Sequence, residues 1–351
     1  MLPFEHRSGL RQLKLLRRIP ESLRDSTGGG IEWHFSGHRP EPAFCLGCYD
    51  QPCLAWAPHE HELEQFSLMS TQASDPVCPV EAISWDNENG VANVNAEACI
   101  GCGICVERCP IGAIAINDQG QARVNVCCLE DTALTETRIV SVSEESVAEH
   151  RRQMASISAV RMLPILNDSE VSNIYQRVAC LAEAQQNRLV RSLLGASGIR
   201  TNLSRKGDVH TRNDGAFEST TIVGPLEIEF GQDSLEAIRA ALDDLAVFHS
   251  RYGCSVSDLS PLVVTLGLPR ERQGYWQIVD DVRKVLGVHV HTMSVGALLI
   301  LVWNHVNVTG DLITECTPRF EHTSIRDQIE RAIKRRIQVD VGFLSILEPE
   351  K

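Results

Sequence analysis

The sequence predicts two domains of different class, an α+β domain followed by an α/β domain. The chain has 351 residues, more than the roughly 100 to 200 residues of an ordinary domain. Ten of its 13 cysteines lie between positions 45 and 128, and from about residue 169 helical and strand-like patterns alternate. We therefore expect a basic N-terminal extension over 1–40, a cysteine-rich domain over 41–130, a linker over 131–168 and an α/β domain over 169–351.

Composition and charge exclude several classes of protein. Apolar residues make up 43% and charged residues 23% of the chain, as in folded proteins and unlike disordered or membrane ones. The longest apolar run, 295–303, is too short to span a bilayer and no secretion signal is recognisable, so we expect no membrane insertion and a cytoplasmic location. Residues 41–130 hold 13 acidic and two basic residues. Such an acidic surface favours a basic partner protein.

Two segments flank the cysteine-rich region. Residues 7–18 are basic, with leucines near helical spacing, and predict a short helix docked on another domain. Residues 131–168 are rich in Ser, Thr and Glu, which is typical of a linker.

The densest cysteine motif is C-x2-C-x2-C-x3-C-P, formed by Cys99, Cys102, Cys105, Cys109 and Pro110. Two-residue gaps wrap a tight loop in which three thiolates converge, and the intervening glycines let the backbone come close to the bound group. This motif resembles that of bacterial ferredoxins.

An internal repeat strengthens the resemblance. Residues 78–83 (CPVEAI) match residues 109–114 (CPIGAI), and each segment is followed by a short strand pattern and a turn ending in glycine. Three further cysteines lie upstream of the first copy, in C-x2-C-x4-C spacing: Cys45, Cys48 and Cys53.

The resemblance, over residues 41–128, implies an α+β ferredoxin-like fold with two 4Fe-4S clusters. In two-cluster ferredoxins the cysteine before proline ligates the other cluster. The resemblance therefore assigns cluster one to Cys45, Cys48, Cys53 and Cys109, and cluster two to Cys99, Cys102, Cys105 and Cys78. The first half departs from the family because 24 residues separate Cys53 from Cys78, an insertion expected on a solvated loop. Cluster one could therefore be of another type.

Other assignments of these residues remain open. Structural zinc also uses C-x2-C pairs. His59 and His61 lie in the insertion, and Cys127 and Cys128 follow the repeat, so none of the four is expected to be a ligand. The remaining isolated cysteines are expected in cores: Cys180, Cys254 and Cys316.

The second half of the chain predicts alternating elements. Apolar spacing predicts helices over 174–193, 234–252, 275–286 and 295–305. Strand patterns occupy 207–230, with a turn at 213–215, and then 262–266 and 288–292.

Helix, strands, helix, strand is the core order of the PD-(D/E)xK nuclease superfamily, a restriction-endonuclease-like α/β fold that this half resembles. The segment 205–215 is similar to its first catalytic strand and turn, and 225–230 to its (D/E)xK strand, with Glu229 in place of lysine. The resemblance implies that Asp208, Glu227 and Glu229 form a carboxylate site for magnesium, with Glu183 as a further acid.

Two functions follow. In one, the clusters transfer single electrons or sense redox state beside a metal-dependent nuclease domain that binds nucleic acid. In the other, the chain is a ferredoxin-type electron-transfer subunit whose C-terminal domain only docks a redox partner. Glu227 and Glu229 would then be the solvent face of a strand.

Overall fold

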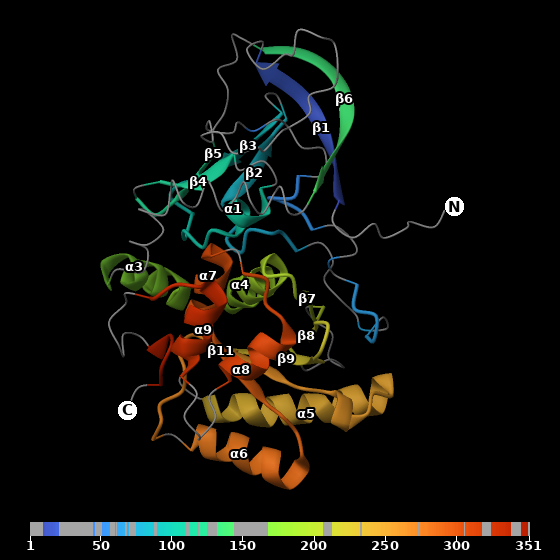
Figure 1. Cartoon of the computed structure of the whole chain (residues 1–351), viewed down its shortest axis with the longest axis vertical. Helices are drawn as coiled ribbons and strands as arrows, with labels where there is room; N and C mark the ends of the chain where they lie inside the picture. Colours follow the sequence, from blue (N-terminus) through green and yellow to red (C-terminus); the bar gives the residue numbers. More distant parts are fainter. Residues whose placement is uncertain are drawn as a thin grey trace.

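The computed structural model describes residues 10–20, 45, 51–56, 60, 62–66, 69, 75–87, 90–109, 113–117, 119–124, 132–143, 168–205, 213–231, 234–272, 274–304, 306–317, 324–337 and 345–349. Figure 1 shows the chain coloured along its sequence, with the cysteine-rich part above and the C-terminal half below.

The cysteine-rich part consists of two small hairpins and a short helix. Strand β2 (Ile83–Asp86) pairs antiparallel with β3 (Val91–Val94), and β4 (Ile114–Ile116) pairs in the same way with β5 (Ala122–Val124). Helix α1 (Ile104–Arg108) lies between the two hairpins in the chain. The predicted strand and glycine turn after each Cys-Pro pair are thus confirmed.

A long two-stranded ribbon corrects two predictions. Residues 7–18 were expected to form a helix, but β1 (Leu10–Pro20) is a strand, and it pairs antiparallel with β6 (Thr132–Ser143), inside the segment expected to be a linker. The partner strand is rich in threonine, valine and isoleucine, which favour strands. Backbone pairing with a segment more than a hundred residues away overrode the local helical spacing.

The C-terminal half begins with two helices where the periodicity predicts one. Helix α3 (Asp168–Ala179) ends before a short break, and α4 (Glu183–Ala196) follows. The break comes at 180–182, where Gln185 accepts a hydrogen bond from the Ala182 N–H and begins the second helix. Hydrophobic spacing cannot detect such a break because both helices present apolar residues to one core.

Five strands form a mixed sheet in the order β11-β10-β9-β8-β7. Strands β7 (Arg200–Leu203), β8 (Gly215–Glu218) and β9 (Val223–Glu229) form an antiparallel meander. Strands β10 (Leu262–Thr265) and β11 (His291–Ser294) then add parallel to β9, and β11 begins three residues later than its predicted segment.

Helices connect and cover these strands. Helix α5 (Ser234–Tyr252) joins β9 to β10, and α6 (Tyr275–Leu286) joins β10 to β11, both at the predicted positions. Three helices follow β11: α7 (Val295–Trp303), α8 (Gly310–Cys316) and α9 (Ile325–Ile333). A 3-10 turn, Val256–Asp258, precedes β10.

The sheet is buried on both faces, and alternate residues of β10 show which helices cover each. Leu262 and Val264 belong to a core with α4 and α7, whereas Val263 belongs to a second core with α5. The first core continues without interruption into the cysteine-rich part, because α1 packs on α4 and α7. Figure 1 shows this arrangement, with α5 and α6 on the side of the sheet away from the cysteines.

Candidate iron-sulfur site and the acidic site of the C-terminal half

The four cysteines assigned to cluster two line one cavity. Cys78, Cys99, Cys102 and Cys105 all contribute to its wall. The other lining residues are apolar or glycine, which limits the access of water to the sulfurs. The tight loop of residues 99–105 and the distant Cys78 therefore meet at one point of the fold, as the sequence predicts.

Backbone N–H groups point at the sulfurs in a pattern that repeats with the sequence. The Ala82 N–H donates to Cys78 Sγ at 3.2 Å, and the Ala113 N–H donates to Cys109 Sγ at the same distance. The Ala122 N–H donates to Cys99 Sγ at 3.4 Å. Such bonds stabilise negative charge on sulfur, so each Cys-Pro-x-x-Ala copy favours a thiolate in the same way.

Burial and crowding make these thiols costly to ionise without a metal. Burial raises the pKa of the Cys78 thiol, and it also raises the pKa of Cys102 and of Cys105, with neighbouring cysteines adding to each. Four neighbouring thiolates repel one another, so the chemistry of the set fits a cationic iron cluster that takes up their charge.

Three of the four cysteines assigned to cluster one lie in the described part of the chain, and Cys48 lies outside it. Burial raises the pKa of Cys53, and the charges of Cys109 and Cys45 raise it further, so the three groups are near neighbours. Cys53 also acts electrostatically on Cys105 of the other set. The two candidate sites are therefore adjacent.

A buried arginine braces the loop after Cys53. Arg108, 6% exposed, donates to the Pro52 carbonyl at 2.6 Å and to both carboxylate oxygens of Glu60 at 2.9 and 3.0 Å. Its guanidinium also lies 3.9 Å from the ring centroid of Trp56. On α4, Gly195 leaves the space that this indole fills, since a Cβ there would lie 2.6 Å from it.

The insertion after Cys53 corrects the expectation of a solvated loop. Leu63, Phe66 and Met69 are at most 5% exposed and belong to the core that α5 covers. The rings of Phe66 and Phe248 lie 4.6 Å apart, edge to face. The segment is held by packing against α5, which comes much later in the chain. His59 and His61 lie outside the described residues.

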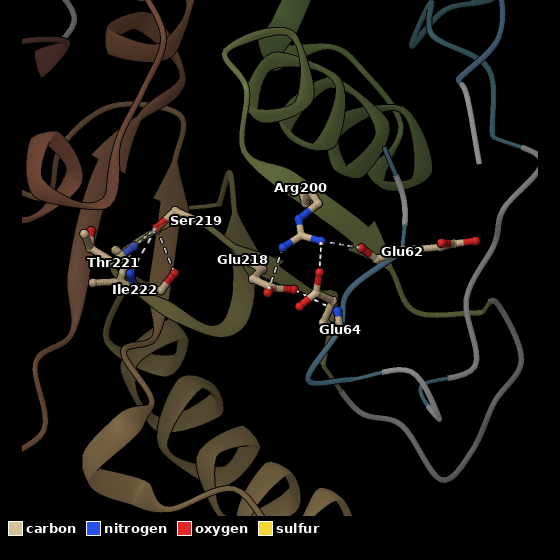
Figure 2. Close-up of polar contacts among 7 residues, drawn as sticks. All are labelled: Glu62, Glu64, Arg200, Glu218, Ser219, Thr221 and Ile222. Carbon is tan, nitrogen blue, oxygen red and sulfur yellow. Dashed lines mark hydrogen bonds and ion pairs between the residues drawn. The ribbon is translucent and has the colours of Figure 1, made fainter. Parts of the chain in front are cut away.

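Polar contacts fasten the same segment to the sheet edge (Figure 2). Arg200 on β7 donates to Glu218 at 2.9 Å and to the Glu62 carbonyl at 3.3 Å, and it reaches Glu64 at 3.4 Å. Glu218 in turn accepts a hydrogen bond from the Glu64 N–H at 2.9 Å. Below, the name insertion clamp is used for the contact of residues 62–66 and Met69 with β7, β8 and α5.

The structure brings together some of the predicted carboxylates and adds two. Glu227 on β9 lies in an acidic environment, because burial and the charges of Asp214, Asp244 and Glu229 raise its pKa to about 9. Glu183 is exposed at the start of α4. Asp208 lies outside the described residues.

The two acids that sequence reasoning did not single out are Asp214 and Asp244. Asp214 precedes β8 and accepts hydrogen bonds from the Ile228 N–H at 2.9 Å and from Asn187 at 3.0 Å. Burial raises its pKa to about 6, and the charges of Glu183 and Glu229 add to the effect. The sequence predicts only a turn at this position. Its place directly before β8, which pairs with the strand of Glu227, is a signal that could have indicated Asp214 as a candidate site residue.

Asp244 projects from α5. It is 2% exposed, and its Oδ2 has no hydrogen-bond partner among the described residues. Burial raises its pKa to about 7, with a contribution from Asp214. In the sequence it is one of two adjacent aspartates on a helix, and nothing there distinguishes the buried one from Asp243.

Within the described ranges, no three His, Cys, Asp or Glu side chains converge on a single metal ion. A cubane differs from a single ion because its four ligands bind four irons and surround a cavity. The described carboxylates do not form a complete magnesium site, so their geometry assigns no reaction step to magnesium. In the same part of the chain, no helix is long and apolar enough to cross a membrane.

Comparison with known proteins identifies the iron-sulfur part. Residues 70–120 match the LdpA Fe-S cluster-binding domain. An uncharacterized ferredoxin of Methanocaldococcus jannaschii is 27% identical over 142 residues, covering 38% of this chain and 75% of that protein. A probable ferredoxin of Methanosarcina thermophila is 54% identical over 35 residues, 10% of this chain and 60% of that protein. Residues 70–120 therefore belong to a ferredoxin-type, iron-sulfur-binding domain.

The similarities are confined to part of the chain. A tetrathionate reductase subunit of Salmonella typhimurium is 31% identical over 80 residues, 23% of this chain and 23% of that protein. These relatives are ferredoxins and a reductase subunit, and they give the nuclease resemblance no support. No solved structure matches the chain.

Proposed function

We propose that the chain is an electron-transfer protein with two 4Fe-4S clusters, held by the two cysteine sets named above. The observation that carries the proposal is the common cavity of Cys78, Cys99, Cys102 and Cys105, which come from two distant segments. The repeated N–H to sulfur bonds at Cys78 and Cys109 support a second, related site. When bound, such clusters accept and release single electrons.

The residues around the sulfurs support this role. The N–H donors to sulfur stabilise the more negative, reduced state, and the apolar lining limits reorganisation of water around it. The proximity of Cys53 to Cys105 supports transfer between the clusters. The acidic segment 41–130 favours a basic redox partner, and some relatives are named as reductase subunits.

Cluster content and ligand substitution test the proposal. Anaerobically prepared protein should hold about eight irons and eight sulfides per chain and give the spectra of reduced 4Fe-4S clusters. Cys78→Ala should halve the iron content, whereas Cys316→Ala, at a buried cysteine of α8, should leave it unchanged. Zinc in place of iron, or full iron content in Cys78→Ala, which offers iron no donor atom, would refute the proposed ligand set.

A second candidate is a nuclease-like role for the C-terminal half. It is favoured by the order of α4, the β7-β8-β9 meander, α5 and a parallel β10, and by Asp214 beside Glu227. Glu183 and Glu229 contribute charge to the same site. The absence of the superfamily lysine from the strand, where Glu229 stands, argues against catalysis.

Cleavage of labelled DNA and RNA, with magnesium or manganese, tests this candidate. Cutting that Asp214→Asn and Glu227→Gln both abolish, with iron content unchanged, would establish it. Asp243→Asn is the matched control. Asp243 is an exposed aspartate next to the buried Asp244 in the chain, so its substitution removes a carboxylate outside the buried acidic site. If neither metal supports cutting, the nuclease candidate is rejected.

A further inference from the structure

The loop that supplies three ligands to cluster two is held by side chains of the C-terminal half. Trp303, at the end of α7, donates from Nε1 to the Cys102 carbonyl at 2.8 Å, and both residues are buried. Arg177, in the last turn of α3, donates to the Cys99 carbonyl at 3.4 Å. Two of the ligand cysteines thus have their backbone oxygens bound by another part of the molecule.

The fit between this loop and α7 is close. Gly103 has φ +78°, and a Cβ there would lie 2.8 Å from Trp303 Nε1. Glycine therefore serves two needs at this position, the left-handed backbone and the space for the indole. The indole lies against the backbone between Cys102 and Cys105, where the loop turns into α1.

Trp303 is itself on a rigid element. Every residue of α7 except Gly296 is buried, and Ser294 caps the helix by accepting a hydrogen bond from the Ala297 N–H at 3.0 Å. A side chain on such a helix holds its partner in one geometry, whereas a side chain on a surface loop would follow the movement of the loop.

We propose that the C-terminal half, through Trp303, positions the ligand loop of cluster two, slows loss of that cluster and raises its reduction potential. This inference rests on the proposed function, because it needs a cluster at Cys78, Cys99, Cys102 and Cys105. Arg177 contributes a weaker effect of the same sign through Cys99. Trp303 acts through the loop and touches no reacting atom, so it is a positioning residue.

The direction of the effect follows from electrostatics. The Trp303 N–H offsets part of the negative partial charge on the carbonyl oxygen of Cys102, a ligand residue, and in a buried setting this change of field is poorly screened. Because the reduced cluster carries one more negative charge, the field stabilises it, and the reduction potential rises. Removal of the donor should lower the potential of cluster two and leave cluster one unchanged.

The test compares two tryptophan substitutions in the full-length holoprotein. Trp303→Phe keeps most of the ring volume and removes the N–H donor. Trp276→Phe is the matched control. Trp276, on α6, is equally buried and donates from Nε1 to the Pro269 carbonyl at 2.9 Å. Paramagnetic resonance during redox titration gives the potential of each cluster, with Cys78→Ser to identify the signal of cluster two. Iron release to a chelator gives the rate of loss.

We expect Trp303→Phe to lower the potential of cluster two and to speed its release about tenfold, while Trp276→Phe changes neither. Arg177→Gln, at an exposed site that should not affect folding, is expected to shift the same potential by less. Unchanged potential and release of cluster two in folded Trp303→Phe would overturn the inference. So would equal effects of both tryptophan variants, which would indicate general loss of stability. Wild-type protein without a second cluster would instead refute the proposed function.

Discussion

The two cysteine sets are held in different ways. The set of cluster two consists of three cysteines on the tight loop of residues 99–105 and one distant cysteine, and α3 and α7 contact that loop directly. In the set of cluster one, Cys53 is followed by a 24-residue segment that contains the insertion, and part of this segment is packed into the C-terminal half as the insertion clamp. A ferredoxin-type repeat has thus been attached to a second domain through both of its halves, once through helices α3 and α7 and once through the insertion clamp.

Shortening the Phe66 side chain of the insertion clamp should have the largest effect on stability. Phe66→Ala removes a ring that is 2% exposed and packs on Phe248, so we expect the free energy of unfolding to fall by about 3–5 kcal/mol. Chemical denaturation measures this change, and iron release should accelerate for cluster one more than for cluster two. Leu286→Ala, at a residue that is 60% exposed, should be near neutral. Equal acceleration for both clusters would show that the two halves are not held independently.

A pair of glycine substitutions sharpens the comparison. Gly103 and Gly90 both have positive φ, but only Gly103 has a side chain within 4 Å of an added Cβ. Gly90→Ala should cost about 1–2 kcal/mol for the left-handed backbone alone. Gly103→Ala should cost more because the methyl group meets Trp303, and cluster two should be lost first. Thermal unfolding and iron content measure both effects, and similar results for the two variants would argue against a tight contact with α7.

The buried acids of the C-terminal half predict a pH dependence unrelated to the clusters. The pKa of Asp244 is raised to about 7 by burial and by Asp214, so the folded chain keeps a proton that the unfolded chain loses above about pH 4. The contribution of Asp244 to the free energy of unfolding should therefore fall between about pH 4 and 7, by on the order of a few kcal/mol, and then level off, whereas Glu227, with its pKa raised to about 9, extends the fall to higher pH. Asp244→Asn should flatten this slope in denaturant titrations. An unchanged slope would assign the effect to Asp214 and Glu227.

The smallest effect is expected from the exposed charge of the insertion clamp. Glu64 is 80% exposed and 3.4 Å from Arg200, so Glu64→Gln should change the free energy of unfolding by less than about 0.5 kcal/mol. Denaturation at low and high salt measures it. A loss of several kcal/mol would mean that the ion pairs, and not Phe66 and its neighbours, hold the insertion.

Local patterns predicted the parts of the fold that depend on local interactions. Helices α5 and α6 begin and end where apolar spacing and glycine place them, because both signals act within a few residues. The pairing of β1 with β6 was missed because it depends on a partner remote in the chain, and the break between α3 and α4 was missed because both helices present apolar residues to one core. Local spacing indicates which face of a segment is apolar but does not indicate what covers that face.

For the candidate sites, the sequence by itself determined which cysteines share one loop and which segment is repeated. Fixed spacing confines Cys99, Cys102 and Cys105 to one loop, and the repeated Cys-Pro-x-x-Ala segment gives the same N–H to sulfur bond at 3.2 Å twice. Only the tertiary structure decided that Trp303, 201 residues beyond Cys102, bonds to the ligand loop. Likewise, only the tertiary structure buries Asp244 and leaves the adjacent Asp243 exposed. The physical reason is that ligand spacing is set by covalent geometry within a loop, whereas burial and remote contacts exist only after the domains have packed together.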